Sequence, residues 1–326
     1  MQIIMNNLLT LGVDLGGTKV DTALVDSSGN IISSYYRLID DSREPGNVIY
    51  SIIDSINRCC SQAGQKPSAL GLGSAGQIDK DQGIVRDSPN LPSWHDVPLR
   101  ARLEEALKIP VIVNNDVRMI TYGEWQHGAG KGIDDLICVF VGTGIGGGVV
   151  TRGQLLEGCR NAAGELGHMT VVAGGRKCHC LNEGCLEAYS GGWAIAERAR
   201  DAVRANPEGG HGLISLAGDI EKITAITVSE GYKNGDPLAQ RLVKDTGRYL
   251  GAGLISAVNA FNPCLLILGG RVITGIPDLA AIAEKRIRSQ ALPAAARDLR
   301  ISLGALGNKA GVIGAATLAR QLVIKE

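Results

Sequence analysis

Aromatic side chains and net charge are both scarce in this chain. Aromatic residues make up 4% of the 326 positions, and only two of them are phenylalanine. Lysine plus arginine number 33, as do aspartate plus glutamate, so the formal net charge is zero. A neutral chain has no overall field to attract nucleic acid or an anionic membrane surface. We therefore expect neither as a partner, and recognition of the substrate by local groups.

Long apolar runs and paired cysteines are also missing. No segment reaches the about 18 to 20 apolar residues of a membrane span, and residues 1–7 lack the basic and hydrophobic regions of a signal peptide. Cys59 and Cys60 are adjacent, and Cys138 and Cys264 lie in apolar, strand-like runs. This distribution favours buried free thiols in a reducing compartment over a disulfide framework. We expect a cytoplasmic protein.

Glycine, in contrast, is abundant, with 44 residues, and its positions suggest a duplicated architecture. Residues 8–25 predict a strand, a tight turn and a returning strand. Residues 135–151 repeat that pattern without close sequence identity. The length and the 44% apolar content allow two cores. We interpret the chain as two similar halves that face one cleft.

Helices and strands alternate through the rest of the chain, which is typical of an α/β protein. Hydrophobic periodicity predicts helices over residues 48–62, 99–107, 186–203 and 237–261, and strands over 70–74, 111–113 and 264–268. Residues 303–312 lead into a final helix that we expect to cross back to the first domain. The predicted division is an N-terminal small lobe of residues 1–117 plus 306–326. The large lobe, 118–305, would hold most of the nucleotide site.

Three cysteines and a histidine form a candidate metal site. The spacing is H-x9-C-x-C-x4-C, contributed by His168, Cys178, Cys180 and Cys185. Thiolate and imidazole are the ligands of closed, tetrahedral Zn²⁺ sites. Glu165 and Glu187 flank the group without being needed as ligands, and His179 offers a rival imidazole. We predict a structural zinc ion that orients the two carboxylates.

The first glycine turn carries the groups that bind nucleotide phosphates. Glycines 16 and 17 would let backbone N–H groups approach, Thr18 supplies a hydroxyl and Lys19 an ammonium. Asp14 could hold Mg²⁺ through water. The alternative is an ordinary glycine hairpin. We predict that Asp14, Gly16, Gly17, Thr18 and Lys19 bind the phosphates of ATP and its Mg²⁺.

The second glycine turn formally matches the dinucleotide fingerprint G-x-G-x-x-G at residues 142–147. That motif must open a helix, whereas residues 149–151 are strand-like, so we reject a Rossmann site. The sequence also lacks the G-x-x-x-x-G-K-[ST] motif of a P-loop. We predict instead that Gly142, Thr143 and Gly144 form a second phosphate turn, and that Gly269 and Gly270 form a third turn that receives the adenosine.

Five stretches together resemble the ROK family of sugar kinases and repressors. Two are the glycine turns within residues 11–19 and 141–148. The others are Glu165-Leu-Gly-His168, the run Cys-His-Cys-Leu-Asn-Glu-Gly-Cys-Leu-Glu at 178–187, and Ser-Pro-Asn-Leu-Pro-Ser-Trp at 88–94. The resemblance covers nearly the whole chain. It implies a two-lobed, actin-like (hexokinase or ribonuclease H-like) α/β ATPase fold with a zinc-stapled loop.

The resemblance also implies roles for individual residues. Asp116 would be the catalytic base, although the residues alone also allow a helix N-cap there. The other sugar-binding positions would be Gly76, Asn90, Asn115, Glu165, His168 and Glu187. The implied reaction is ATP-dependent phosphorylation of the 6-hydroxyl of a hexose, with glucose favoured by the stretch around Asn90. We expect a homodimer, the commonest symmetric assembly.

Three other functions remain as alternatives. Kinases of N-acetylmannosamine or N-acetylglucosamine share the acids and the zinc loop. A non-catalytic sugar sensor would lose the base or the phosphate turns, and both are present. A DNA-binding repressor needs a helix-turn-helix, and about seven residues precede the first predicted strand.

The sequence departs from the family pattern at a few positions. Leu181 replaces a glycine in the zinc loop, and Ala75 stands where many members have proline. Val117 and Arg118 replace a pair of small residues after Asp116. We expect Arg118 to point to solvent, with an effect on substrate choice as the alternative.

Overall fold

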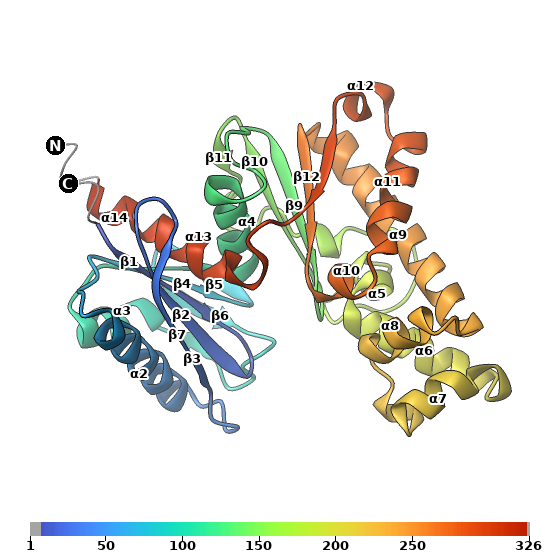
Figure 1. The fold of residues 1–326 in the computed structure, drawn as a ribbon, viewed down its shortest axis with the longest axis horizontal. Coiled ribbons are helices and arrows are strands. Elements are labelled where there is room, and N and C mark those ends of the chain that lie inside the picture. The colour runs from blue at the N-terminus through green and yellow to red at the C-terminus, as the bar shows by residue number, and fades with distance from the viewer. Residues whose placement is uncertain (1–7, 325–326) are drawn as a thin grey trace. The chain divides into compact units, whose positions relative to one another are not determined.

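The computed structural model describes residues 8–324, which divide into two compact units (Figure 1). Unit 1 contains the chain through Ile133, together with Leu155–Ala163 and the segment from Gly304 onward. Unit 2 contains Asp134–Gln154 and Gly164–Leu303. Among the described residues, no helix combines the length and the hydropathy needed to span a bilayer.

The core of unit 1 is a five-stranded mixed sheet. Its strands are β1 (Thr10–Leu15), β2 (Lys19–Val25), β3 (Ile31–Leu38), β4 (Leu70–Ser74) and β8 (Val111–Asn115), in the order β3-β2-β1-β4-β8. Strands β1, β4 and β8 are parallel, and Leu15, Ser74 and Asn115 align at their carboxyl ends. Ligands bind at such edges of α/β sheets. The first glycine turn and Asp116 therefore begin at the same edge.

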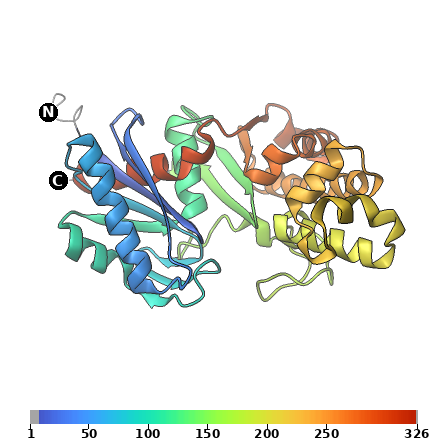
Figure 2. The same cartoon turned by 60° about the horizontal axis from the view of Figure 1, so that its bottom comes forward.

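Helices cover both faces of this sheet. Leu11, Val13 and Leu15 share a core with helices α2 (Pro45–Ala63) and α3 (Leu99–Leu107), and α2 lies across that face (Figures 1 and 2). Gly12 faces the other way, because side chains alternate along a strand. A Cβ on Gly12 would lie 1.8 Å from the carbonyl oxygen of Val312. Helix α13 (Ala310–Ala319) can therefore pack directly on the backbone of β1.

Unit 2 repeats this strand order. Its strands are β9 (Leu136–Val141), β10 (Ile145–Thr151), β11 (Gln154–Leu155), β12 (Leu265–Gly269) and β13 (Arg300–Leu303), arranged as β11-β10-β9-β12-β13. The β9–β10 pair is antiparallel, whereas β12 runs parallel to β9 and β13, as β4 does to β1 and β8. The prediction of two similar halves is confirmed at the level of strand topology.

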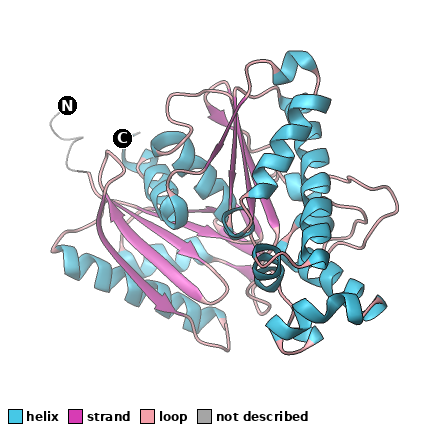
Figure 3. Ribbon diagram, turned by 45° about the vertical axis from the view of Figure 1, so that its right-hand side comes forward, coloured by secondary structure: helices cyan, strands magenta, loops and turns pink. Residues whose placement is uncertain are grey.

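Unit 2 is richer in helices than unit 1. Figure 3 distinguishes the helices, in cyan, from the strands. The longest is α9 (Pro237–Phe261), with the bounds that its periodicity predicts, and it packs on α11 (Asp278–Gln290). The remaining helices of unit 2 are α5 (Glu187–Ser190), α6 (Gly192–Ala205), α7 (His211–Ala217), α8 (Ala225–Lys233), α10 (Arg271–Gly275) and α12 (Pro293–Ala296). The single helix predicted over 186–203 is thus two, because Gly191 adopts an extended conformation with ψ of 154°.

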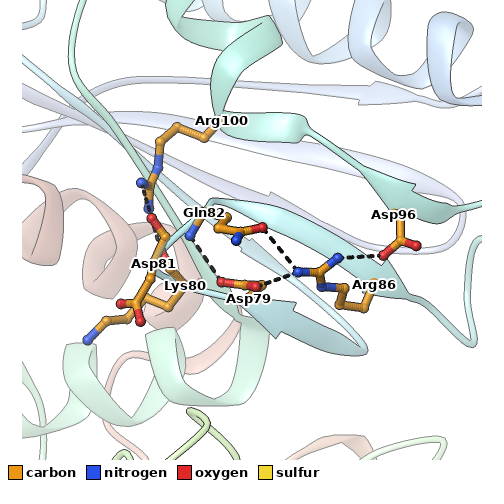
Figure 4. A network of polar contacts seen from close by, with 7 residues as sticks. All are labelled: Asp79, Lys80, Asp81, Gln82, Arg86, Asp96 and Arg100. Carbon is orange, nitrogen blue, oxygen red and sulfur yellow. Dashed lines mark hydrogen bonds and ion pairs between the residues drawn. The ribbon is translucent and has the colours of Figure 1, made fainter.

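A third, three-stranded sheet in unit 1 contains β5 (Gln77–Asp79), β6 (Ile84–Asp87) and β7 (His95–Val97). Arg86 binds this sheet together, since its guanidinium lies 2.6 Å from Asp79 and 2.9 Å from Asp96 (Figure 4). Arg100 donates to the carbonyl oxygen of Asp81 at 2.9 Å. The network fixes the turn between β5 and β6 and ties β6 to β7.

The division between the units falls later than residue 117, where we predicted it. Helix α4 (Asp116–His127) belongs to unit 1, and so does the chain as far as Ile133. Glycines explain this packing: a Cβ on Gly123 would lie 2.4 Å from the carbonyl oxygen of Ala310. Helix α4 therefore sits tightly against α13. The short helix α14 (Gln321–Ile324) follows α13 in the same unit.

Candidate functional site

Two aspartates lie close together at the carboxyl edge of the unit 1 sheet. Asp14 is on β1, opposite Asp21 on β2, and Asp116 follows β8. The carboxylate of Asp14 is buried among protein atoms, although the residue as a whole is only partly shielded from solvent. This burial, together with the negative charges of Asp116 and Asp21, raises the pKa of Asp14 to about 7. Two carboxylates held this close attract a proton or a metal cation.

Asp116 is not the N-cap of helix α4. The cap is Asn115, whose side-chain oxygen accepts from the backbone N–H groups of Val117 at 3.0 Å and Arg118 at 3.3 Å. The N-cap alternative for Asp116 is therefore wrong, because the neighbouring amide already satisfies those donors. Asp116 occupies the first helical position, where the helix dipole favours its negative charge.

The first glycine turn closes on itself through a bond of 3.0 Å from the Gly16 N–H to the carbonyl oxygen of Lys19. Asn90 lies beside this turn, since a Cβ on Gly17 would be 3.1 Å from the Asn90 Cβ. Lys19 forms an ion pair with Asp21.

Gly76 ends the loop after β4 in a conformation that requires glycine. Its φ is 107°, and a Cβ there would lie 2.1 Å from the carbonyl oxygen of Asp87. The side-chain amide of Asn115 is within 3.5 Å of the Gly76 carbonyl oxygen. Gly76 and Asn90 thus lie on loops of unit 1, whereas Asn115 ends β8 and Asp116 begins α4; all four are predicted sugar-site residues.

The prediction that Arg118 points to solvent is wrong. Only 2% of the residue is exposed, and its guanidinium donates to Asn161 Oδ1 at 2.9 Å and to the carbonyl oxygen of Ala163. Asn161 in turn donates to Asn114 Oδ1 at 3.0 Å. A planar guanidinium with several donors can bind such an irregular segment. Arg118 therefore fixes residues 155–163 on unit 1, just before Glu165 in the sequence.

The second glycine turn, at residues 142–144, joins the antiparallel strands β9 and β10. The motif does not open a helix, so the rejection of a Rossmann site is confirmed. Gly270, at the end of β12, has a φ of 91°, and a Cβ on it would lie 2.3 Å from the carbonyl oxygen of Val141. Gly269 and Gly270 thus lie next to the second turn, within unit 2.

The four predicted metal ligands converge. The ligand atoms of His168, Cys178, Cys180 and Cys185 all lie within 4.8 Å of one another. Sulfur ligands of a tetrahedral ion with Zn–S bonds of about 2.3 Å are roughly 3.8 Å apart. The Cys180 and Cys185 sulfurs are separated by 3.7 Å, as are Cys178 Sγ and His168 Nδ1. The donor set and its spacing therefore fit Zn²⁺.

Two neighbours of this group resolve questions that the sequence leaves open. His179 stacks on Trp193, with ring centroids 3.9 Å apart and planes at 22°, whereas His168 belongs to the ligand group. Leu181 is exposed and does not adopt a positive φ; that conformation falls on Gly184, with φ of 78°. The substitution of leucine for glycine is therefore compatible with the loop.

Glu187 begins α5 and is held by two donors of unit 2. Its Oε2 accepts from the Ile145 N–H at 2.6 Å, and its Oε1 accepts from the indole N–H of Trp193 at 3.1 Å. Glu165, by contrast, is exposed at the start of the 3₁₀ turn η1 (Leu166–His168). The two carboxylates that flank the metal ligands are thus differently constrained.

Sequence reasoning missed Trp193 and the partners of Arg118. A signal exists for Trp193, since it is one of three tryptophans and follows two glycines. Local sequence gives no signal for the network between Arg118 and Asn161, because its members are separated by 43 positions.

Comparison with known proteins agrees with this geometry. A model of the ROK family matches residues 10–322. A glucokinase of Streptomyces coelicolor is 33% identical over 319 residues, covering 96% of this chain and 98% of the relative. The xylose repressor of Bacillus subtilis is 30% identical over 312 residues, covering 95% of this chain and 76% of the repressor.

A solved structure gives the same result. The ROK family glucokinase from Streptomyces griseus, crystallised in complex with glucose and AMPPNP, superimposes with a TM-score of 0.78. It is 33% identical, and the match covers 96% of this chain and 99% of that one. By sequence and by structure, the chain belongs to the ROK family.

Proposed function

We propose that this protein is an ATP-dependent sugar kinase that phosphorylates the 6-hydroxyl of a hexose, with glucose as the preferred substrate. The observation that carries the proposal is the pair of close carboxylates, Asp14 and Asp116, beside the first glycine turn. The glucokinase relatives support the reaction and the sugar. The duplicated strand order supports an actin-like ATPase fold with one half in each unit.

In the proposed reaction, Asp116 accepts the proton of the sugar's 6-hydroxyl as the oxygen attacks the γ-phosphorus of ATP and ADP leaves. Phosphoryl transfer needs alignment and neutralised charge more than covalent help from the protein. Asp116 suits the base because Asn115 takes over the capping of helix α4, and the Val117 N–H fixes one carboxylate oxygen at 2.9 Å.

The phosphates are proposed to contact the two glycine turns and Lys19. Asp14 would hold Mg²⁺, which supplies positive charge for the developing negative charge on the phosphoryl oxygens. The amides of Gly142 and Ile145 already have acceptors, Gly144 and Glu187. Those of Thr143 and Gly144, which lie between them, are therefore the ones that we assign to phosphate. Gly269 and Gly270 would receive the adenosine.

The residues proposed to bind sugar hydroxyls are Gly76, Asn90, Asn115, Asp116, Glu165, His168 and Glu187. Zn²⁺ bound by His168, Cys178, Cys180 and Cys185 would have no open position, so its contribution is to order the loop that carries these side chains. A reducing, ATP-rich cytoplasm suits both the thiolates and the reaction, and we further propose a homodimer.

A coupled assay of ADP release tests the proposal. The zinc-loaded protein, ATP and Mg²⁺ are combined with glucose, mannose, N-acetylglucosamine and N-acetylmannosamine in turn. We expect the highest kcat/KM with glucose, and hexose 6-phosphate as the product by mass spectrometry. The absence of sugar-dependent ADP release with every hexose would contradict the proposal. Sedimentation velocity tests the homodimer separately.

A further inference from the structure

The second glycine turn is held from one short segment of unit 2. The Gly192 N–H donates to the carbonyl oxygen of Gly142, and the Trp193 N–H donates to that of Thr143, both at 3.0 Å. The Glu187 carboxylate accepts from the Ile145 N–H at 2.6 Å. Residues 187–193 therefore fix both ends of the turn.

The same segment is attached to the loop that carries the metal ligands. It begins two positions after Cys185. Leu186, which immediately precedes it, donates its N–H to the carbonyl oxygen of Met169, next to His168, at 2.8 Å. The His179 ring, between two ligand cysteines, stacks on the half-buried Trp193. One apolar cluster contains Cys178, Cys180, Cys185, Ala188, Tyr189 and Trp193. Ordering of the cysteine loop can thus stabilise the conformation of the turn through direct contacts.

Glu187 joins the two structures, and its fit is tight. Both of its oxygens accept hydrogen bonds, one from the turn and one from the Trp193 indole. A Cβ on Gly144 would lie 2.3 Å from Glu187 Oε2, so the carboxylate occupies the space that a side chain at 144 would need. Loss of the Glu187 carboxylate from this position would therefore remove a hydrogen bond and a packing contact from the turn.

We propose that Glu187 and Trp193 are positioning residues that couple the metal-binding loop to the second glycine turn, so that zinc occupancy sets the affinity for the phosphates of ATP. The coupling rests on the proposed function, because it assigns phosphate to that turn. The zinc loop would then affect the binding of the nucleotide as well as the binding of the sugar.

The first test measures nucleotide binding without sugar and without turnover. The affinity for AMPPNP with Mg²⁺ is determined by calorimetry for the zinc-loaded protein and after chelation, with circular dichroism to verify folding. We expect chelation to weaken binding at least about tenfold, the effect of losing one charge-assisted hydrogen bond. Equal affinity in both states would overturn the coupling.

Tryptophan emission reports the connection directly. Removal of zinc should change the emission of the wild type and of Trp125→Phe, a matched control in helix α4. The change should disappear in Trp193→Phe, because Trp193 is the tryptophan that touches the cysteine loop. A zinc-dependent change that persists in Trp193→Phe would contradict the assignment.

Substitutions that retain zinc separate coupling from loss of folding. Trp193→Phe keeps an aromatic ring against His179 but removes the indole donor. The KM for ATP should therefore rise about threefold, with kcat unchanged. In Glu187→Gln, a single amide oxygen replaces the two carboxylate oxygens that accept from the Ile145 N–H and the Trp193 indole. This variant should bind AMPPNP about tenfold more weakly. Each variant is analysed for zinc content.

The double variant Glu187→Gln/Trp193→Phe provides the sharpest test. With the indole donor gone, the glutamine oxygen can accept from the Ile145 N–H alone. The loss of AMPPNP affinity in the double variant should therefore be no greater than in Glu187→Gln. Additive effects of the two substitutions would instead weaken binding about thirtyfold. Additive losses would contradict the connection through Glu187. If the zinc-loaded wild type binds no nucleotide, the proposed function itself fails; if it binds and the variants bind equally, only the coupling fails.

Discussion

The two glycine turns occupy corresponding places in two sheets of the same strand order, yet they are built differently. Both turns close through a backbone hydrogen bond of their own, from Gly16 to Lys19 in the first and from Gly142 to Gly144 in the second. Charged groups lie on the strands that flank the first turn, Asp14 before it and Lys19 after it. The second turn has no charged residue between Val141 and Thr151, and residues 187–193 hold it. Two sheets of the same strand order therefore differ in that charged side chains flank one turn, whereas a separate segment holds the backbone of the other.

The largest effect that this comparison predicts concerns the edge of the first sheet. In Asp116→Asn, kcat should fall by about 10²- to 10⁴-fold, because an amide cannot accept the proton of the hydroxyl. The affinity for AMPPNP and for sugar should change less than about twofold, since asparagine keeps the shape of the side chain. Steady-state kinetics and calorimetry measure the two quantities. Asp54→Asn on helix α2 is the control, and full turnover in Asp116→Asn would remove Asp116 from the mechanism.

A second effect is the pH dependence that Asp14 gives to the metal-free protein. Its pKa is about 7 in the folded state and 3.8 when unperturbed. The folded state therefore holds more protons between these values, and the free energy of unfolding falls as pH rises through this range. Above pH ~7 the cost reaches up to about 4 kcal/mol, at about 1.4 kcal/mol per pKa unit.

Asp14→Asn should remove this cost. Denaturant unfolding in EDTA, followed from pH ~5 to ~8, should show a stability gain for the variant that grows with pH and levels off above ~7. Mg²⁺ should stabilise the wild type but not the variant at the alkaline end, because ionised Asp14 is the proposed ligand. A gain independent of pH would indicate that Asp14 does not titrate in this range.

The smallest effect distinguishes two glycines of the second turn. A Cβ on Gly144 collides with Glu187 Oε2, whereas Gly142 has no atom within 4 Å of that position, and neither has a positive φ. Gly144→Ala should raise the KM for ATP about tenfold, equivalent to about 1 to 2 kcal/mol of overpacking. Gly142→Ala should remain within about twofold. Equal effects would mean that Glu187 does not hold the turn.

Sequence was sufficient where local pattern determines structure. Helix α9 follows from the period of Leu250, Leu254 and Val258, and the metal group follows from the spacing of its ligands. The glycine hairpins were predictable for the same reason. The sheet β5-β6-β7 was not, because strands of three or four residues leave little periodicity to detect. The break in the predicted helix 186–203 depends on one backbone angle at Gly191.

Long-range contacts account for the other differences. The boundary near residue 117 was predicted from the end of a strand, but helix α4 packs on α13 through Gly123 and Gly314. Arg118 is buried because Asn161 and Ala163, distant in sequence, satisfy its donors. Such partners follow from tertiary packing and not from the identity of the neighbouring residues.

A crystal structure of the zinc-loaded protein with AMPPNP, Mg²⁺ and glucose tests the central claim most directly. The account predicts a carboxylate oxygen of Asp116 within hydrogen-bond distance, about 2.6 to 3.2 Å, of the glucose 6-hydroxyl, with that hydroxyl in line with the γ-phosphorus. A bound sugar whose 6-hydroxyl contacts another base, or a γ-phosphate remote from Asp116, would contradict it.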